Sequence, residues 1–310
     1  MSSTDTIKNF FGLQKMPFGK LIGVNELYRS SSFEEACARL QMGLENVDAV
    51  LLSGAVGSGK SNVLRYFTHN LDPNAYRYIY IAADCFKIGE IAKRALMALQ
   101  VEVPYGGSLA LRRLQQTIVK LNREKGIKPL LIIDEVQDLP TSTLVSLKNL
   151  LNYGMDSEIL LFLILCGQSS IYEKLGYPQL EALDRRLRIR YALRPLSLEE
   201  SGYYISHQMK VCGVEQSVFS DDAKAGIFQH SKGIPGEINA ICFDLLIYAV
   251  AQTKQIIEPS MLEVVLQNRR RTPPTPRNCE GRLPRIYHRK NTRSRLPFRI
   301  SIWYRRNTHV

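Results

Sequence analysis

Residues 49–67 read AVLLSGAVGSGKSNVLRYF, an apolar run that leads into a glycine-rich turn and then into a helical pattern. The turn, Gly54 to Ser61, has the spacing G-x-x-x-x-G-K-S of a phosphate-binding loop. Its glycines allow backbone N–H groups to face the phosphates, and the positive end of the following helix adds to the attraction. A buried strand before the loop and a helix after it are the context that the motif requires. This stretch predicts a nucleotide site in an α/β fold.

A second apolar run, LLIIDE at residues 130–135, ends in two carboxylates. Asp134 is expected to hold Mg²⁺ through water, together with the hydroxyl of Ser61, while Lys60 reaches the β and γ phosphates. Glu135 is expected to polarise a water molecule for attack on the γ-phosphate, as a hydrolase requires. No N-K-x-D motif for guanine follows, and no D-x-x-G switch replaces the acidic pair. The expected ligands are therefore ATP and Mg²⁺, and the expected activity is ATP hydrolysis.

Three further apolar runs, at residues 76–83, 158–167 and 188–193, alternate with helical patterns. Together with the two runs above they predict five strands in a doubly wound parallel sheet. After Pro195 the patterns are helical only, which predicts a small all-helical second domain. The predicted division is a core at 1–195 that includes an N-terminal linker, a helical domain at 196–268 and a tail at 269–310.

Two helix starts carry the S-x-x-E pattern of a capping box, in which a serine and a glutamate satisfy each other's backbone N–H groups. One is expected at Ser32 and Glu35, the other at Ser197 and Glu200.

The excess positive charge is confined to the tail. Residues 269–310 hold thirteen basic residues against one acid, which accounts for the whole formal net charge of +12, whereas residues 1–268 are neutral. With Tyr287, Phe298, Trp303 and Tyr304 interleaved, such a tail could bind nucleic acid through phosphate contacts and stacking. The abrupt shift to arginine is also typical of a frameshift or read-through past a gene end, and a partner-binding or solubility role is a third interpretation. The prolines and the lack of periodicity predict disorder there.

The six cysteines are far apart and have no metal-ligand spacing, which indicates reduced thiols, no zinc site and a cytoplasmic protein. The longest apolar run is much shorter than the roughly 20 residues of a membrane helix, so no membrane segment is expected.

Polar residues at two further places are candidates for the reaction. Gln168 follows the run at 158–167, where its amide could face the γ-phosphate or simply bond to the loop backbone. Arg185 and Arg186 follow a helical pattern, where an arginine could reach the nucleotide of an adjacent subunit. Arg186 is the preferred candidate, and plain solvation is the alternative.

Residues 7–268 resemble the AAA+ ATPases of the ExeA-like family, which is similar to the TnsC-like and MuB-like transposition helpers. The resemblance lies in seven stretches: NFFGLQKMPFGK, LYRSSSFEEACARLQMGLEN, LLSGAVGSGKS, LLIIDEVQDL, LLNYGMDS, LILCGQ and GIPGEINAICFDLL. It implies a five-stranded ATPase core, a helical lid and ATP-dependent self-assembly into a homo-oligomer with active sites at subunit interfaces.

Carried over to this sequence, the resemblance makes Asp134 and Glu135 the Walker B pair, Gln168 the sensor 1 residue and Arg186 a finger that acts on a neighbouring subunit. It also places Tyr28 near the adenine. The implied nucleotide-binding residues are the Walker A loop with its flank and this tyrosine: Gly54, Ala55, Val56, Gly57, Ser58, Gly59, Lys60, Ser61, Asn62 and Tyr28.

One position departs from the family pattern. The lid usually reads G-[IV]-P-R, with the arginine as the sensor 2 group that links the lid to the γ-phosphate, whereas KGIPGEIN here has Gly236 in that place. Loss of this cation is expected to slow turnover unless Lys232 substitutes for it.

Three functions remain open for such an ATPase. The favoured hypothesis is an ATP-switched helper of a mobile element that binds double-stranded DNA and a transposase. The alternatives are an ExeA-like ATPase of secretion or envelope assembly, and a regulatory ATPase that does not bind DNA.

Overall fold

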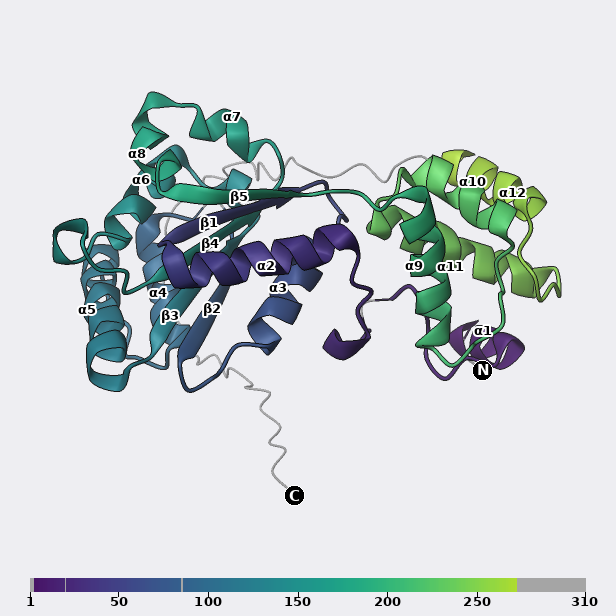
Figure 1. The fold of residues 1–310 in the computed structure, drawn as a ribbon, viewed down its shortest axis with the longest axis horizontal. Helices are drawn as coiled ribbons and strands as arrows, with labels where there is room; N and C mark the ends of the chain where they lie inside the picture. The colour runs from purple at the N-terminus through teal and green to yellow at the C-terminus, as the bar shows by residue number, and fades with distance from the viewer. Residues whose placement is uncertain (1–2, 20, 85, 272–310) are drawn as a thin grey trace, which may run out of the picture. The chain divides into compact units, whose positions relative to one another are not determined.

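A five-stranded parallel sheet forms the centre of the core in the computed structural model, which describes residues 3–19, 21–84 and 86–271. The spatial order is β2-β3-β4-β1-β5 (Figure 1). The strands are β1 (Ala49–Gly54), β2 (Tyr76–Ala82), β3 (Lys128–Asp134), β4 (Phe162–Gly167) and β5 (Leu187–Leu193). All five predicted strands and the doubly wound parallel arrangement are confirmed. Strand β4 begins only at Phe162, which pairs with Leu130, so the first part of the run at 158–167 leads into the strand.

Helices cover both faces of this sheet (Figure 1). Helices α2 and α3 pack on one face, and α4 to α8 pack on the other. Successive residues of a central strand alternate between the two apolar clusters: Leu51 contacts one and Leu52 the other. The helices are α2 (Ser31–Asn46), α3 (Lys60–His69), α4 (Ile88–Ala98), α5 (Gly107–Lys125), α6 (Thr141–Leu150), α7 (Ile171–Leu175) and α8 (Glu181–Asp184).

The lid, which follows β5, is built from helices α9 (Leu198–Lys210), α10 (Asp221–Ser231), α11 (Pro235–Ala251) and α12 (Pro259–Arg271) around a third apolar cluster. Helix α1 (Ser3–Phe11) also packs into this cluster, through Ile7 and Phe11. The N-terminal segment therefore packs with the lid helices, although the sequence pattern grouped it with the core.

The last helix passes the boundary expected from the sequence, because α12 continues to Arg271 and not only to residue 268. The predictions for the remainder of the basic tail fall on residues 272–310, outside the described residues. None of the helices in the described ranges combines the length and apolarity needed to cross a bilayer.

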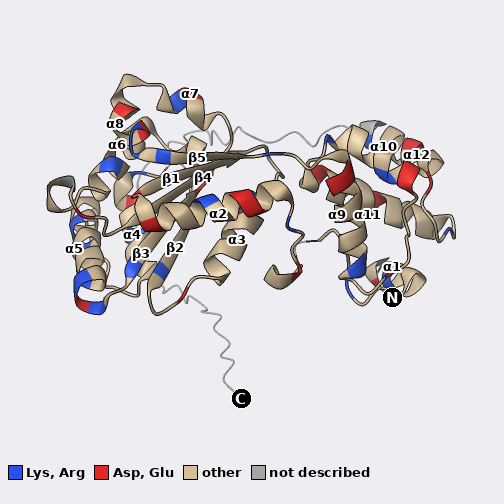
Figure 2. Cartoon of the chain, in the orientation of Figure 1, with Lys and Arg blue, Asp and Glu red and all other residues tan. Residues whose placement is uncertain are grey.

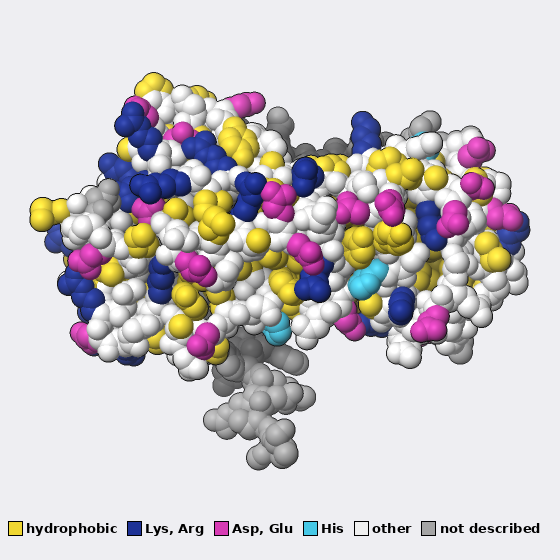
Figure 3. Space-filling model, in the orientation of Figure 1, with side chains coloured by type: hydrophobic (Ala, Val, Ile, Leu, Met, Phe, Trp, Pro, Cys, Tyr) yellow, Lys and Arg dark blue, Asp and Glu magenta, His cyan; other side chains and the backbone are white. Residues whose placement is uncertain are grey.

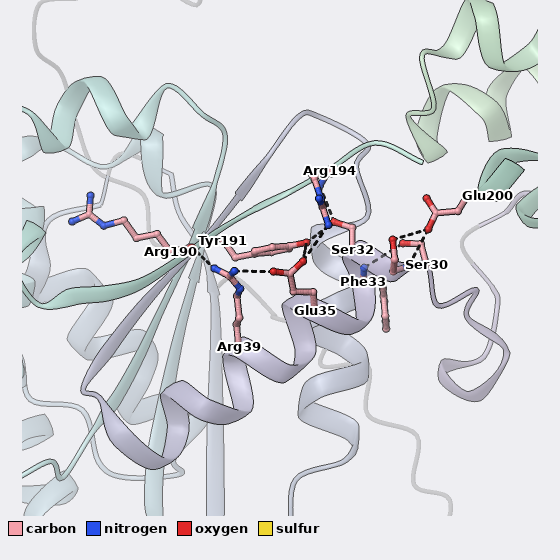
Figure 4. Close-up of polar contacts among 10 residues, drawn as sticks. Ser30, Ser32, Phe33, Glu35, Arg39, Arg190, Tyr191, Arg194 and Glu200 are labelled. Carbon is pink, nitrogen blue, oxygen red and sulfur yellow. Dashed lines mark hydrogen bonds and ion pairs between the residues drawn. The ribbon is translucent and has the colours of Figure 1, made fainter. Parts of the chain in front are cut away.

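The capping box predicted at Ser32 and Glu35 is wrong, because the N-cap of α2 lies two residues earlier than Ser32 and the helix begins at Ser31. Ser30 is the N-cap, and its hydroxyl accepts from the backbone N–H of Phe33 at 3.2 Å (Figure 4). Ser32 instead accepts from the backbone N–H of Arg194 at 2.9 Å, just after β5. Three consecutive serines offer three possible caps, and tertiary contacts with β5 decide between them.

The predicted capping box at Ser197 and Glu200 is confirmed at the start of α9. Glu200 also accepts hydrogen bonds from the backbone N–H and the hydroxyl of Ser31, at 3.0 and 2.9 Å (Figure 4). One carboxylate thus satisfies N–H groups at the amino ends of two helices, α9 of the lid and α2 of the core.

Candidate nucleotide-binding site

The predicted phosphate loop connects β1 to α3 at the carboxyl edge of the sheet. Gly59 has φ 101°, a conformation that glycine adopts without strain, and α3 begins directly after it at Lys60. The Lys60 side chain is only 7% exposed, and its ammonium donates to the carbonyls of Gly54 and Ala55, each at 2.9 Å. These two hydrogen bonds hold the Lys60 ammonium inside the loop, where a phosphate would bind.

The carboxylate of Asp134 is buried at the end of β3 and oriented from two sides. The Tyr80 hydroxyl on neighbouring β2 donates to Oδ2 at 2.7 Å, and the backbone N–H of Glu135 donates to Oδ1 at 2.9 Å. Burial, together with this carboxylate, raises the pKa of Tyr80 well above its ordinary value, so the phenol remains a donor. The sequence pattern of alternating tyrosines in β2 did not reveal this role.

Glu135 adopts a left-handed backbone conformation, with φ 53° and ψ 40°. Such a conformation is uncommon for a residue other than glycine and often marks a functional site. The Gln137 amide donates to Glu135 Oε2 at 2.7 Å, and the Gln168 amide lies 3.4 Å from the same oxygen. Gln137 also accepts from the backbone N–H of Gln168 at 2.9 Å.

The structure thus brings together Glu135 and Gln168, which the sequence had singled out, through a residue that it had not. Gln137 links the carboxyl end of β3 to that of β4, and a Cβ at Gly167 would lie only 2.5 Å from its amide oxygen. The glutamine two positions after the acidic pair was the available signal.

A cavity of about 550 Å³ opens beside the phosphate loop, with walls from the core and the lid. Of the residues expected to bind nucleotide, Ser58, Gly59, Ser61 and Asn62 line its loop side, and Tyr28 lies in its wall. The Tyr28 ring packs edge-on against Tyr204 of α9, with 5.7 Å between centroids. The cavity size and the neighbouring loop suit a nucleotide whose base would lie against these aromatic rings.

Gln208 of α9 is a cavity-lining residue that the sequence did not single out. Its side chain is 2% exposed, and its Oε1 has no hydrogen-bond partner among the described residues. A buried amide without a partner is costly, so a polar ligand in the cavity could offset that cost. A single glutamine in an amphipathic helix gives no signal of this kind at the sequence level.

The oxygen donors beside the loop fit a magnesium ion held chiefly by nucleotide phosphates. Ser61 lies exposed at the start of α3, and Asp134 supplies a carboxylate; both are hard oxygen ligands of the kind that Mg²⁺ prefers. Within the described residues no group of three or more His, Cys, Asp or Glu side chains forms a metal site made of protein ligands alone.

Replacing Tyr80 with phenylalanine is expected to raise the Mg²⁺ concentration needed for half-maximal nucleotide binding by about tenfold, because an outer-sphere partner of a metal ligand is lost. The measurement is fluorescent-nucleotide binding titrated with MgCl₂. Tyr78→Phe is the matched control, since Tyr78 lies on the same strand with a similar exposure, 51% against 50%. Equal Mg²⁺ dependence in the two variants would contradict this role for Tyr80.

The structure places Arg186 away from this subunit's own phosphate loop. Arg186 immediately precedes β5, at the amino edge of the sheet, whereas Gly54 and Asp134 end their strands at the carboxyl edge. Its guanidinium forms an ion pair with Asp48, and the two side chains are 15% and 17% exposed. Arg185 is paired with Glu181 but is 78% exposed.

The sheet order, the phosphate loop and the acidic pair at the end of β3 define a P-loop NTPase of the AAA+ class. Residues 45–175 match the model of a family described as an AAA domain. This match spans the phosphate loop, the acidic pair and Gln168.

A curated relative, general secretion pathway protein A of Aeromonas hydrophila, is 33% identical over 250 residues. The match covers 78% of this chain and 45% of that protein, so the chain spans less than half of the relative's length.

Solved structures show the same fold at low sequence identity. Cdc6p from Pyrobaculum aerophilum has a TM-score of 0.66 and 16% identity over 81% of this chain and 70% of its own. Drosophila ORC bound to DNA has a TM-score of 0.61 and 15% identity over 86% of this chain and 65% of that chain. At such identities the likeness supports the fold alone.

Proposed function

We propose that this chain binds Mg·ATP in the cavity beside the phosphate loop and hydrolyses it. The observation that carries the proposal is the arrangement of three side chains at the carboxyl edge of the sheet. Lys60 lies within the phosphate loop, and Asp134 and Glu135 lie where β3 ends. The base would lie in the wall formed by Tyr28 and the lid, and the phosphates would lie against the N–H groups of the loop.

Each residue has a defined part in the hydrolysis. Ser61 and Asp134 would hold the magnesium ion, which neutralises charge on the β and γ phosphates. Glu135 takes a proton from the attacking water, and the water oxygen bonds to the γ-phosphorus. The bond between the γ-phosphorus and the bridging β-phosphate oxygen breaks, which releases ADP and inorganic phosphate. Gln137 and Gln168 orient the Glu135 carboxylate through their hydrogen bonds.

The proposed biological role is that of an ATPase in a secretion-related assembly. It rests on the similarity to general secretion pathway protein A, 33% identical over 250 residues. This corrects the emphasis of the sequence patterns, which favoured a DNA-binding transposition helper and kept secretion as the alternative. Figure 2 shows Lys and Arg interspersed with Asp and Glu along the described helices, whereas a duplex-binding protein commonly gathers its basic residues on one face or along one helix.

A binding assay with duplex DNA distinguishes the two roles. The full chain and residues 1–271, which form one compact unit, are tested with ATP, ADP and no nucleotide, alongside an ATPase assay. The secretion proposal expects ATP hydrolysis that Lys60→Ala abolishes, and no ATP-dependent retention of DNA by residues 1–271. Retention that requires ATP and is lost in Lys60→Ala would support the DNA-helper role instead.

A chimera tests the secretion role directly. In Aeromonas hydrophila that lacks general secretion pathway protein A, the matching 250-residue segment of that protein is replaced with the segment of this chain. Restored secretion by the chimera, and none by the same chimera with Lys60→Ala, is the expected result. An ATP-hydrolysing chimera that restores no secretion would count against the role.

A further inference from the structure

The lid contacts the phosphate loop through two glycines. The backbone N–H of Gly236, the second residue of α11, donates to the carbonyl of Gly57 at 2.9 Å. Gly57 lies in the tight turn of the loop, in which the N–H of Ser58 donates to Ala55 O at 3.2 Å. The peptide unit between Gly57 and Ser58 is therefore held by the lid on its carbonyl side and by the loop on its N–H side.

This approach leaves no room for a side chain on either residue. A Cβ at Gly236 would lie 2.9 Å from the Gly57 Cα and 3.3 Å from its carbonyl oxygen. A Cβ at Gly57, which has φ 77°, would lie 3.2 Å from the Gly236 Cα. Because the neighbouring atoms are backbone, relief requires the loop or the helix to move. The arginine expected at position 236 from the family pattern would displace one of them.

The contact borders the proposed nucleotide site. Ser58 and Gly59 of the loop line the cavity, and so do Pro235 and Asn239 of α11, on either side of Gly236. A nucleotide in this cavity would contact both the loop and the lid. The conformation of the loop, which decides where its N–H groups face, is thus linked directly to the position of α11.

We propose that Gly236 is a positioning residue, through which the lid holds the phosphate loop in its binding conformation by a backbone contact alone. This inference rests on the proposed nucleotide site. A sensor 2 arginine would reach the γ-phosphate, but a backbone N–H bonded to Gly57 O reaches only the turn of the loop. The position of the lid therefore responds in the same way to ADP and to ATP in the loop. ATP is distinguished from ADP by its γ-phosphate, at Glu135 and Gln168.

The test compares Gly236→Ala with Gly202→Ala. Gly202 lies inside α9 of the same lid, and a Cβ there would meet only the Lys224 side chain, at 3.9 Å. Alanine favours a helix over glycine at both positions, so a loss specific to Gly236→Ala reports the contact with Gly57. Binding of fluorescent ATP and ADP is measured with Mg²⁺. We expect both affinities to fall by the same factor, about tenfold, a change of about 1.4 kcal/mol, in Gly236→Ala and to remain unchanged in Gly202→Ala.

Unchanged affinities in Gly236→Ala, or a loss for ATP alone, would overturn the inference. If this variant does not fold, hydrogen exchange of the wild-type chain gives an independent answer. ADP and ATP are expected to protect the amides at the amino end of α11 equally, and protection by ATP alone would contradict the inference. A wild-type chain that binds neither nucleotide would instead refute the proposed function itself.

Discussion

Glu135→Gln is expected to lower kcat for ATP hydrolysis by about 10²- to 10³-fold, in the range of a lost general base, while leaving ATP affinity almost unchanged. The substitution preserves size and removes only the ability to accept a proton from water. Glu135 follows β3 and has a left-handed backbone conformation, and the Gln137 amide donates to its carboxylate at 2.7 Å. Phosphate release under saturating ATP gives kcat, and fluorescent-nucleotide titration gives the affinity.

Glu124→Gln serves as the control for this substitution, because Glu124 is exposed on α5 with its nearest ion-pair partner, Lys120, on the same helix. Its kcat should equal that of the wild type. A Glu135→Gln variant that retained its kcat would remove Glu135 from the reaction. One that lost ATP binding as well would mean that the side chain serves the loop and not the attacking water.

Local patterns were enough to predict the sheet and the loop. A phosphate loop requires a strand before it and a helix after it, and each apolar run was long enough to identify a strand. The capping box at Ser197 was also predictable, since its two partners are three residues apart. The cap at Ser30 was not, because the choice among three serines depends on contacts with β5, about 160 residues away in sequence.

The same distinction applies to the site. Lys60, Asp134 and Glu135 belong to motifs whose spacing alone indicates their chemistry. Tyr80 bonds across strands to Asp134, and Gln208 lines a cavity with walls from the core and the lid, so the surroundings of both depend on how the chain folds. Gly236 illustrates the limit most clearly. The sequence showed a missing arginine, whereas the structure shows a close approach to Gly57 that only glycine permits.

The finger residue is the second case in which the structure changes the expectation. The sequence favoured Arg186 over Arg185, but Arg186 is mostly buried in an ion pair with Asp48. Arg185 is 78% exposed. Figure 3 shows a group of basic side chains over α7, α8 and the start of β5, with acidic side chains among them. Arg185 lies just before β5, at the amino edge of the sheet, opposite the phosphate loop of its own chain. It could therefore act only on the nucleotide of a neighbouring subunit.

We therefore propose Arg185 as the finger and expect Arg185→Ala to lower kcat by about 10³-fold, within the range for arginines that stabilise the transferring phosphate. Arg186→Ala is expected mainly to lower the melting temperature, since it leaves the Asp48 carboxylate without this partner.

The decisive measurement mixes Arg185→Ala with Glu135→Gln. Each is inactive alone, but an Arg185→Ala site that receives Arg185 from a Glu135→Gln neighbour regains hydrolysis. If activity returns only when Arg186→Ala replaces Arg185→Ala in the mixture, Arg186 is the finger. Recovery in neither mixture would mean that this edge does not act on a neighbouring subunit's nucleotide.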